Sequence, residues 1–223
     1  MKNKDNQLKL LDVGCGDGKF LDYIKENKVL NINSFGLDPT NESALKCSNK
    51  GHKVFCMDTK KFKANFQNEL FDTITSFHVL EHIANPKTFM QELVSLIQPT
   101  GEIFISTPFS PMDFELQWFD PLNHPPHHMG RWNISSYRKL ALELELNVEF
   151  FMPEPSSLIN STLNSFFFSK YGTSIKVSKK EKIISILKTP NRFIFHLYKQ
   201  SKREKVLNRR AANVILVKFT KKL

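Results

Sequence analysis

Short apolar runs alternate with helical patterns over the first 152 residues of the chain. Helices are expected after the first, second, fourth and fifth runs, and the clearest begins at Asn85-Pro86 and repeats apolar residues at helical spacing. Alternation of this kind is typical of a parallel α/β sheet. The expected strands are Leu8 to Val13, Ser34 to Asp38, Lys53 to Asp58, Phe71 to Phe77, Glu102 to Thr107 and Asn147 to Met152.

Two segments interrupt this alternation. Residues 108–132 contain five prolines and no clear period, and a loop of this length inside a domain is usually functional or disordered. Residues 153–210 break the pattern again, with Pro190 separating two expected helices, and Ala212 to Phe219 resumes it as a last strand. We therefore expect a core formed by residues 1–152 and 211–223, with an inserted helical cap at residues 153–210.

A glycine-rich turn follows the first expected strand. It reads D-x-G-x-G-x-G, from Asp12 through Gly14 and Gly16 to Gly18. Glycines between a strand and a helix let a ligand approach bare backbone at the helix N-terminus. A dinucleotide loop, G-x-G-x-x-G, would need glycine where Lys19 stands, so the spacing indicates a different nucleotide ligand.

Polar residues stand at the ends of four expected strands. Because ligands bind at the carboxyl ends of strands in a doubly wound sheet, we expect Asp12, Asp38, Asp58 and Phe77-His78 to converge. Asp38 could accept both hydrogens of a ribose diol, a device that NAD enzymes share. Asp58 could accept a hydrogen bond from an adenine amine, with Met57 packed on the ring.

Several motifs together resemble the class I S-adenosylmethionine-dependent methyltransferases. They are LDVGCGDGKFL, GLDP, the acid in CMDT, FDTITSFHVLEHIANP and GEIFIST, and HVLEHIANP is similar to the ubiquinone-biosynthesis-type branch with methyltransferase domain 23. The resemblance implies a Rossmann-like, doubly wound, mostly parallel seven-stranded sheet, its last strand antiparallel and preceded by a basic helical insertion.

The same resemblance assigns roles to the cofactor-binding residues. Asp12, Gly14, Gly16 and Gly18 would contact the methionine part of S-adenosylmethionine. Asp38 would hold the ribose, and Asp58 with Met57 the adenine. Phe77 and His78 would line the cofactor from the fourth strand.

Histidines crowd the long loop on the side where an acceptor pocket usually lies in this fold. His127 or His128 is a candidate general base, since histidine titrates near neutral pH. Alternatively, these histidines shape the loop through hydrogen bonds or bind substrate without proton transfer. Aromatic residues in and beside the loop could wall the acceptor pocket or form a lid, and they are Phe109, Phe114, Trp118, Phe119 and Trp132.

A histidine–glutamate group follows the fourth strand. His78, Glu81 and His82 would share one face of a helical turn and could ligate a divalent ion. Some ubiquinone-type relatives have been proposed to bind metal through E-x-x-E-H, from which His78 departs. We favour an interpretation without metal, in which Glu81 and His82 orient the cofactor loop and the following helix.

Charge is divided unevenly between the two parts of the chain. Residues 1–150 carry 16 Lys and Arg against 19 Asp and Glu, a net −3, while residues 151–223 carry 16 against 3, a net +13. Residues 158–168 are rich in Leu, Ile and Phe, and residues 179–203 interleave apolar and basic side chains. Residues 158–203 could be a cap whose charges face water, a surface for anionic membranes or a lipid-linked substrate, or, less favoured, a nucleic-acid surface.

The expected activity is methyl transfer from S-adenosylmethionine, most simply to an oxygen of a small molecule, a saccharide or a lipid-linked intermediate. The alternatives are an RNA methyltransferase and a non-catalytic cofactor-binding protein. Base N-methylation enzymes usually carry D/N-P-P-Y/F after strand four, where this chain has Ser76-Phe77-His78-Val79. Three cysteines without a C-x-x-C pair fit a reducing compartment, so we expect a cytoplasmic protein, with peripheral membrane association open.

Overall fold

The chain divides into two compact units in its computed structural model. The first comprises Met1–Ser110, Asp120–Phe151 and Val214–Leu223, and the second comprises Pro111–Phe119 and Met152–Asn213. The residues that the structure describes are 7–27, 31–112, 121–152, 158–159, 162–163, 166–167, 178–207 and 213–222.

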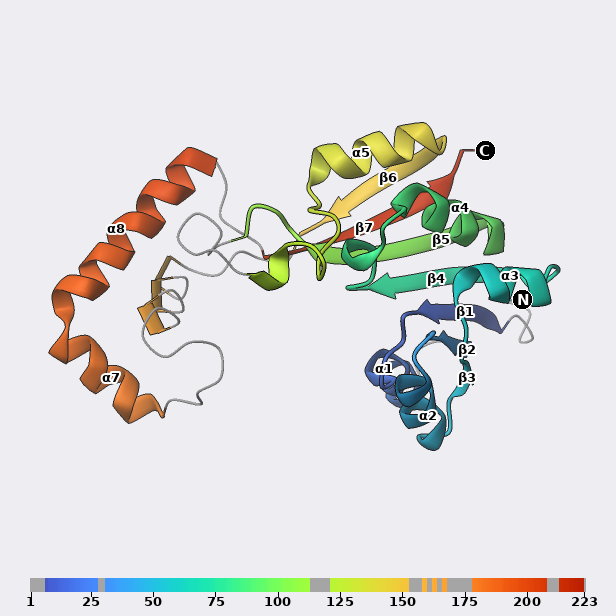
Figure 1. Cartoon of the computed structure of the whole chain (residues 1–223), viewed down its shortest axis with the longest axis horizontal. Coiled ribbons are helices and arrows are strands. Elements are labelled where there is room, and N and C mark those ends of the chain that lie inside the picture. Colours follow the sequence, from blue (N-terminus) through green and yellow to red (C-terminus); the bar gives the residue numbers. More distant parts are fainter. Residues whose placement is uncertain are drawn as a thin grey trace, which may run out of the picture. The chain divides into compact units, whose positions relative to one another are not determined.

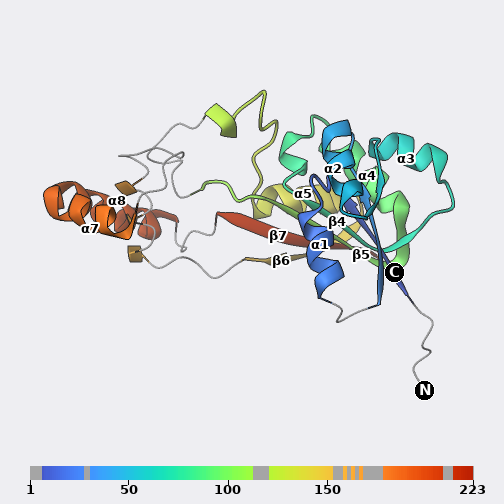
Figure 2. The same cartoon turned by 90° about the horizontal axis from the view of Figure 1, so that it is seen from below.

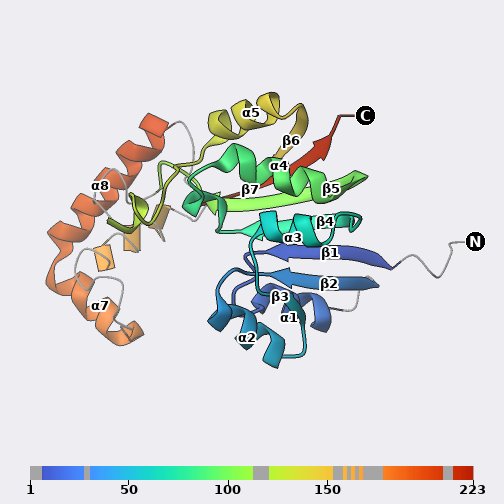
Figure 3. The ribbon, with the colours of Figure 1, turned by 45° about the vertical axis from the view of Figure 1, so that its right-hand side comes forward.

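The first unit is built on a seven-stranded sheet in the order β3-β2-β1-β4-β5-β7-β6 (Figure 1). The central pairs are parallel, while β7 is antiparallel to both β5 and β6, so that its arrow opposes those of β1 and β2 in Figure 3. The expected doubly wound sheet with an antiparallel last strand is therefore confirmed. The strands are β1 (Leu8–Val13), β2 (Ile32–Leu37), β3 (Lys53–Phe55), β4 (Phe71–Phe77), β5 (Ile97–Pro108), β6 (Leu146–Phe151) and β7 (Val214–Lys221).

Helices connect these strands, and several begin at side-chain caps. Asn85 accepts a hydrogen bond from the Thr88 amide, with Pro86 at the first helical position, as the sequence predicts. The helices of the first unit are α1 (Lys19–Glu26), α2 (Asn41–Asn49), α3 (Thr59–Asn65), α4 (Pro86–Leu96) and α5 (Ile134–Glu143), with 3₁₀ turns η1 (Leu80–His82) and η2 (Pro121–Asn123). The second unit contains α7 (Lys179–Lys188) and α8 (Pro190–Leu207), separated where Pro190 predicts a break.

Some expected boundaries are wrong. The third strand ends at Phe55 because Asp58 caps an unexpected helix, α3, by accepting a hydrogen bond from the Lys61 amide. In α3 only Thr59 and Phe62 are buried, too few to give a helical period. The other strands are displaced by smaller amounts, apart from β5, which starts at Ile97 rather than Glu102 and passes through an irregular register opposite β4.

Hydrophobic side chains cover both faces of the sheet. Successive residues of β1 point to opposite faces, so Leu11 and Val13 join the main core while Leu10 joins a second cluster with Leu21 of α1 and Cys47 of α2. The burial of both faces explains why the central strands are apolar, as in parallel sheets generally. It also leaves the strand ends as the place where polar side chains gather.

Replacing Leu93 of α4 by alanine should lower the free energy of unfolding by about 2–5 kcal/mol, because this fully buried side chain would leave a cavity. The matched control is Leu142→Ala in α5, where the side chain is 72% exposed. That change should alter the free energy of unfolding by at most about 0.5 kcal/mol. Urea denaturation followed by circular dichroism measures both, and equal losses would contradict the described burial.

Candidate functional site

The glycine-rich turn between β1 and α1 is tied to the end of β2 by Asp38. The Gly16 amide donates a hydrogen bond of 3.0 Å to Asp38 Oδ2, and the Thr40 amide donates one of 2.8 Å to Oδ1. Asp38 is 7% exposed. One carboxylate therefore holds the turn that follows β1 and the entry to α2, and it keeps unused lone pairs on both oxygens.

Asp12 is the second buried acid at this edge of the sheet. Thr75 Oγ1 of β4 donates a hydrogen bond of 2.7 Å to Asp12 Oδ1, across the register that pairs the two residues. Burial, and to a smaller extent the nearby charge of Asp38, raise the pKa of Asp12 to about 6, although the hydrogen bond from Thr75 opposes the rise. Among the described residues, neither carboxylate forms an ion pair with a cationic side chain, so this edge can accept a cationic ligand group.

The three glycines of the turn have different surroundings. All have positive φ, at +76°, +54° and +82° for Gly14, Gly16 and Gly18. A Cβ at Gly14 would lie 2.3 Å from Val79 Cγ2, and one at Gly18 would lie 2.5 Å from Cys47 Sγ, whereas one at Gly16 would meet nothing within 4 Å. Gly16 thus faces open space beside Asp38, while Gly14 and Gly18 permit close packing of the protein itself.

The remaining expected cofactor residues lie past the ends of β3 and at the end of β4. Asp58 is exposed and caps α3, and Met57 packs in part against the main core. Phe77 is half-buried and meets Phe20 of α1 edge to face, with ring centroids 5.0 Å apart. His78 adopts φ of +57°, an uncommon conformation outside glycine that accompanies turns and functional sites.

The turn after β4 holds the histidine-rich loop through main-chain hydrogen bonds. The amides of Met129 and Gly130 both donate to the Glu81 carbonyl, at 2.7 and 3.1 Å. His82 Nδ1 donates to the His127 carbonyl at 2.7 Å, which leaves His82 Nε2 unprotonated when the ring is neutral. The loop that carries His127 and His128 is therefore attached to the turn that follows Phe77 and His78.

Glu81, whose carbonyl accepts the two hydrogen bonds from the histidine-rich loop, also has a buried side-chain carboxylate. Its side chain is 2% exposed, Oε1 lies 3.3 Å from His78 Nδ1, and Oε2 has no hydrogen-bond partner in the described part of the chain. The Glu81 carboxylate raises the pKa of His78, because it stabilises the protonated ring. No residue pattern in the sequence singled out the main-chain role of Glu81.

The structure groups the potential metal ligands differently from the sequence prediction. Glu81, His82 and His128 each offer a ligand atom, and these atoms lie within 4.8 Å of one another. The rings of His82 and His128 meet edge to face at 4.9 Å. These three residues, rather than the set with His78, could hold a divalent ion, because η1 is a short 3₁₀ turn that His78 precedes.

The aromatic residues beside the loop belong to the core where the structure describes them. Phe109 and Trp132 are both buried, join the main cluster and form an isolated parallel bridge. Trp132 also lies against Tyr137, whose hydroxyl is 2.8 Å from Thr107 Oγ1. The burial of these two side chains agrees with the expected alternative, aromatic residues that pack over the core, and a role as walls of an acceptor pocket stays a prediction. The other three, Phe114, Trp118 and Phe119, lie outside the described residues.

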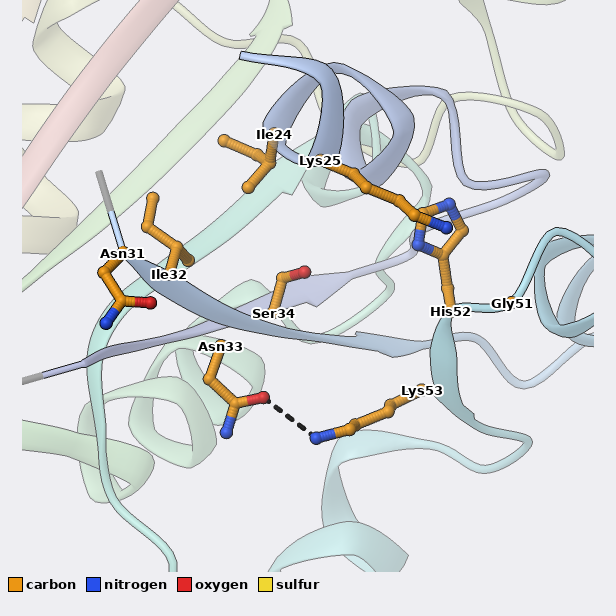
Figure 4. A pocket seen from close by; sticks show the side chains of 9 residues that line it. All are labelled: Ile24, Lys25, Asn31, Ile32, Asn33, Ser34, Gly51, His52 and Lys53. Carbon is orange, nitrogen blue, oxygen red and sulfur yellow. Dashed lines mark hydrogen bonds between the residues drawn. The ribbon is translucent and has the colours of Figure 1, made fainter. Parts of the chain in front are cut away.

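A pocket of about 490 Å³ lies elsewhere in the first unit. Its walls come from α1 and from the beginnings of β2 and β3, as Figure 4 shows, so it lies at the opposite end of these strands from Asp38. Lys53 Nζ donates a hydrogen bond of 3.0 Å to Asn33 Oδ1 at its edge. The lining residues are Ile24, Lys25, Asn31, Ile32, Asn33, Ser34, Gly51, His52 and Lys53.

Part of the sequence matches a known protein family and known relatives. A family model described as a methyltransferase domain matches residues 2–149, about two thirds of the chain. The chain belongs to this methyltransferase-domain family. One curated relative is a ubiquinone biosynthesis O-methyltransferase of Pectobacterium atrosepticum. It is 30% identical over 101 residues, which cover 44% of this chain and 42% of that protein. A protein of the same description from Vibrio vulnificus is 30% identical over 101 residues, 44% of this chain and 43% of its own.

Solved structures share the fold at low sequence identity. A SAM-dependent methyltransferase from Archaeoglobus fulgidus superposes with a TM-score of 0.64 at 18% identity, covering 97% of this chain and 87% of its own. The plantazolicin methyltransferase BpumL in complex with SAH gives a TM-score of 0.59 at 15% identity, covering 99% and 78%. At this low identity, the solved structures show only that the fold is shared. The chain spans less than half the length of the curated relatives that it matches.

Gly14→Ala should destabilise the chain more than Gly16→Ala. Both changes force a side chain into positive φ, at a cost of about 1–2 kcal/mol. Only Gly14→Ala adds a steric overlap, with the stiff side chain of Val79. Thermal unfolding should therefore give the lower melting temperature for Gly14→Ala, and the reverse order would contradict the described packing of the turn.

Asp12→Asn should stabilise the chain more at pH 7 than at pH 4. With a folded-state pKa near 6, Asp12 holds a proton between about pH 4 and 6 that the unfolded chain has released, so its contribution to stability falls as the pH rises through this range. Asparagine keeps an acceptor for Thr75 and removes the charge. The difference between variant and parent should grow by up to about 3 kcal/mol across the range. Urea denaturation at both pH values measures the free energies of unfolding of variant and parent. A difference between them that is the same at pH 4 and pH 7 would contradict the raised pKa of Asp12.

Proposed function

We propose that this chain is an S-adenosylmethionine-dependent methyltransferase whose cofactor lies at the carboxyl ends of β1 to β4. The observation that carries the proposal is the open face of Gly16 beside two buried carboxylates, Asp12 and Asp38, that lack a cationic partner among the described residues. A positively charged sulfonium ligand with an amino group fits such an edge, and a Cβ at position 16 would intrude on it. Membership of the methyltransferase-domain family supports the same assignment.

The individual residues would then act as follows. Asp12 and the amides of the glycine turn hold the methionine part, with Asp12 kept ionised by the bound positive charge. Asp38 uses its free lone pairs for the ribose hydroxyls, since the Gly16 and Thr40 amides already fix its orientation. Asp58 and Met57 bind the adenine past the end of β3, and Phe77 and His78 line the site from β4.

The cofactor supplies an activated methyl group, so the protein has mainly to align the acceptor. His127 and His128 are the candidates for removing the acceptor proton. The His82 ring and the Glu81 carbonyl hold the backbone of this loop, which leaves the exposed His127 imidazole available to an acceptor. A base placed in this way accelerates transfer to a hydroxyl, whose proton must leave.

The acceptor class that we favour is a hydroxyl of a small molecule, a saccharide or a lipid-linked intermediate. The curated relatives with 30% identity are described as O-methyltransferases of ubiquinone biosynthesis, which supports oxygen as the methylated atom. Methylation of RNA is the second candidate, since residues 151–223 carry a net charge of +13.

Asp38→Asn should weaken S-adenosylmethionine binding at least tenfold in calorimetry, because it removes a charge and an acceptor from the ribose site. Asp72→Asn is the matched control. Asp72 also accepts a backbone hydrogen bond, from the Lys9 amide at 2.8 Å, and it lies near the beginning of β4. Failure of the parent chain to bind S-adenosylmethionine, or equal affinities of parent and Asp38→Asn, would refute the proposed site.

Replacing the general base should lower turnover about 100-fold or more while leaving cofactor affinity within about threefold. His127→Ala and His128→Ala are tested separately with methyl-labelled S-adenosylmethionine and fractions of a cell extract as acceptors. His124→Ala is the control within the same loop. A variant that retains the parent's rate excludes its histidine as the base, and loss of turnover in all three variants indicates a role in loop shape instead.

A further inference from the structure

The two helices of the second unit expose large apolar side chains at helical spacing. In α7, Ile183 and Leu187 are one turn apart and are 60% and 74% exposed. In α8, Ile194 and Tyr198 are likewise one turn apart and are 60% and 63% exposed. Ile184 and Phe195 lie beside these pairs, also exposed. We call these six side chains, with the exposed basic residues among them, the α7–α8 face.

The opposite side of the same helices packs within the second unit. Phe193 and His196 of α8 meet the ring of the buried Phe166, with centroids 5.8 and 5.9 Å away. Ser185 of α7 is buried as well. Each helix is therefore amphipathic, with one side contributing to the interior of the second unit and the other carrying the α7–α8 face.

Positive charge accompanies the exposed apolar side chains. Residues 179–207 contain nine Lys and Arg against two Glu, a net charge of +7. Four of the basic residues are described as exposed, and they are Lys188, Arg192, Lys199 and Lys202. Lys199 Nζ lies 4.7 Å from the centre of the Phe195 ring, so basic and apolar groups are interleaved on the exposed side of α8. Figure 2 shows α7 and α8 following one another as two consecutive helices.

We infer that the α7–α8 face binds the surface of an anionic membrane. A basic helical surface with exposed aliphatic and aromatic side chains lies in the interface with its apolar groups among the acyl chains and its Lys and Arg at the headgroups. Four of the six apolar side chains are aliphatic, which suits acyl chains better than stacked nucleic-acid bases. No helix in the described part of the chain has the length and apolarity to cross a bilayer.

Co-sedimentation of the full chain with vesicles tests the inference. Binding should be at least tenfold tighter to phosphatidylcholine vesicles containing phosphatidylglycerol, at about 30%, than to phosphatidylcholine alone, and it should weaken as salt rises. The double variant Leu187→Ser/Ile194→Ser should lose at least tenfold in affinity. The matched control is Leu142→Ser in α5, equally apolar and 72% exposed, which should stay within twofold of the parent.

A second double variant tests the contribution of the basic residues to vesicle binding separately from that of the apolar ones. Lys188→Gln/Lys199→Gln keeps every apolar side chain and should weaken binding to the anionic vesicles about tenfold or more, since each basic residue near such a surface contributes roughly fivefold. Circular dichroism and thermal unfolding establish that each variant is folded.

Two results would overturn the inference: no binding of the parent to the anionic vesicles, and unchanged binding to them by the folded Leu187→Ser/Ile194→Ser variant. If the parent does not bind the vesicles but binds RNA, and Lys188→Gln/Lys199→Gln weakens that RNA binding, the surface is assigned to nucleic acid. Because the vesicle assay contains no S-adenosylmethionine and no acceptor, its outcome is independent of the proposed methyl transfer.

Discussion

The hydrogen bonds of Asp38 join the parts from which the candidate site is built. One oxygen holds the Gly16 amide of the turn after β1, and the other holds the Thr40 amide at the start of α2. Because a buried polar group left without a hydrogen-bond partner is costly, these amides and the acid depend on one another. Loss of this one group would release the glycine turn, the entry to α2 and the proposed ribose contacts together.

Asp12 is a second buried acid at the same edge of the sheet, close enough to Asp38 for the two charges to repel each other. Two buried acids close enough for one to raise the pKa of the other make the ligand-free edge costly, and a positively charged ligand would remove that cost. Binding energy at this edge would therefore come partly from relief of repulsion already present in the protein.

The sequence predicts the strands along the chain, and Asp12 and Asp38 at the ends of two of them, because both follow from local patterns. Apolar runs give the strands, and parallel strands place their carboxyl ends at one edge. Thr75 was missed because its contact with Asp12 depends on strand register, and α3 was missed because its short amphipathic face buries only Thr59 and Phe62. The hydrogen bonds from the amides of residues 129 and 130 to the Glu81 carbonyl were not predicted. They use only main-chain atoms, which every residue type has, so no sequence pattern marks them.

That attachment has an evolutionary consequence. The bonds from the Met129 and Gly130 amides to the Glu81 carbonyl do not depend on the side chains of the loop, and any residue except proline retains the donor. Side chains of the loop can therefore diverge between related proteins while its backbone stays hydrogen-bonded to η1, the turn that follows β4. In the proposed site, acceptor preference could thus change by substitution in the loop alone, while the residues at the ends of β1 and β2 stay as they are.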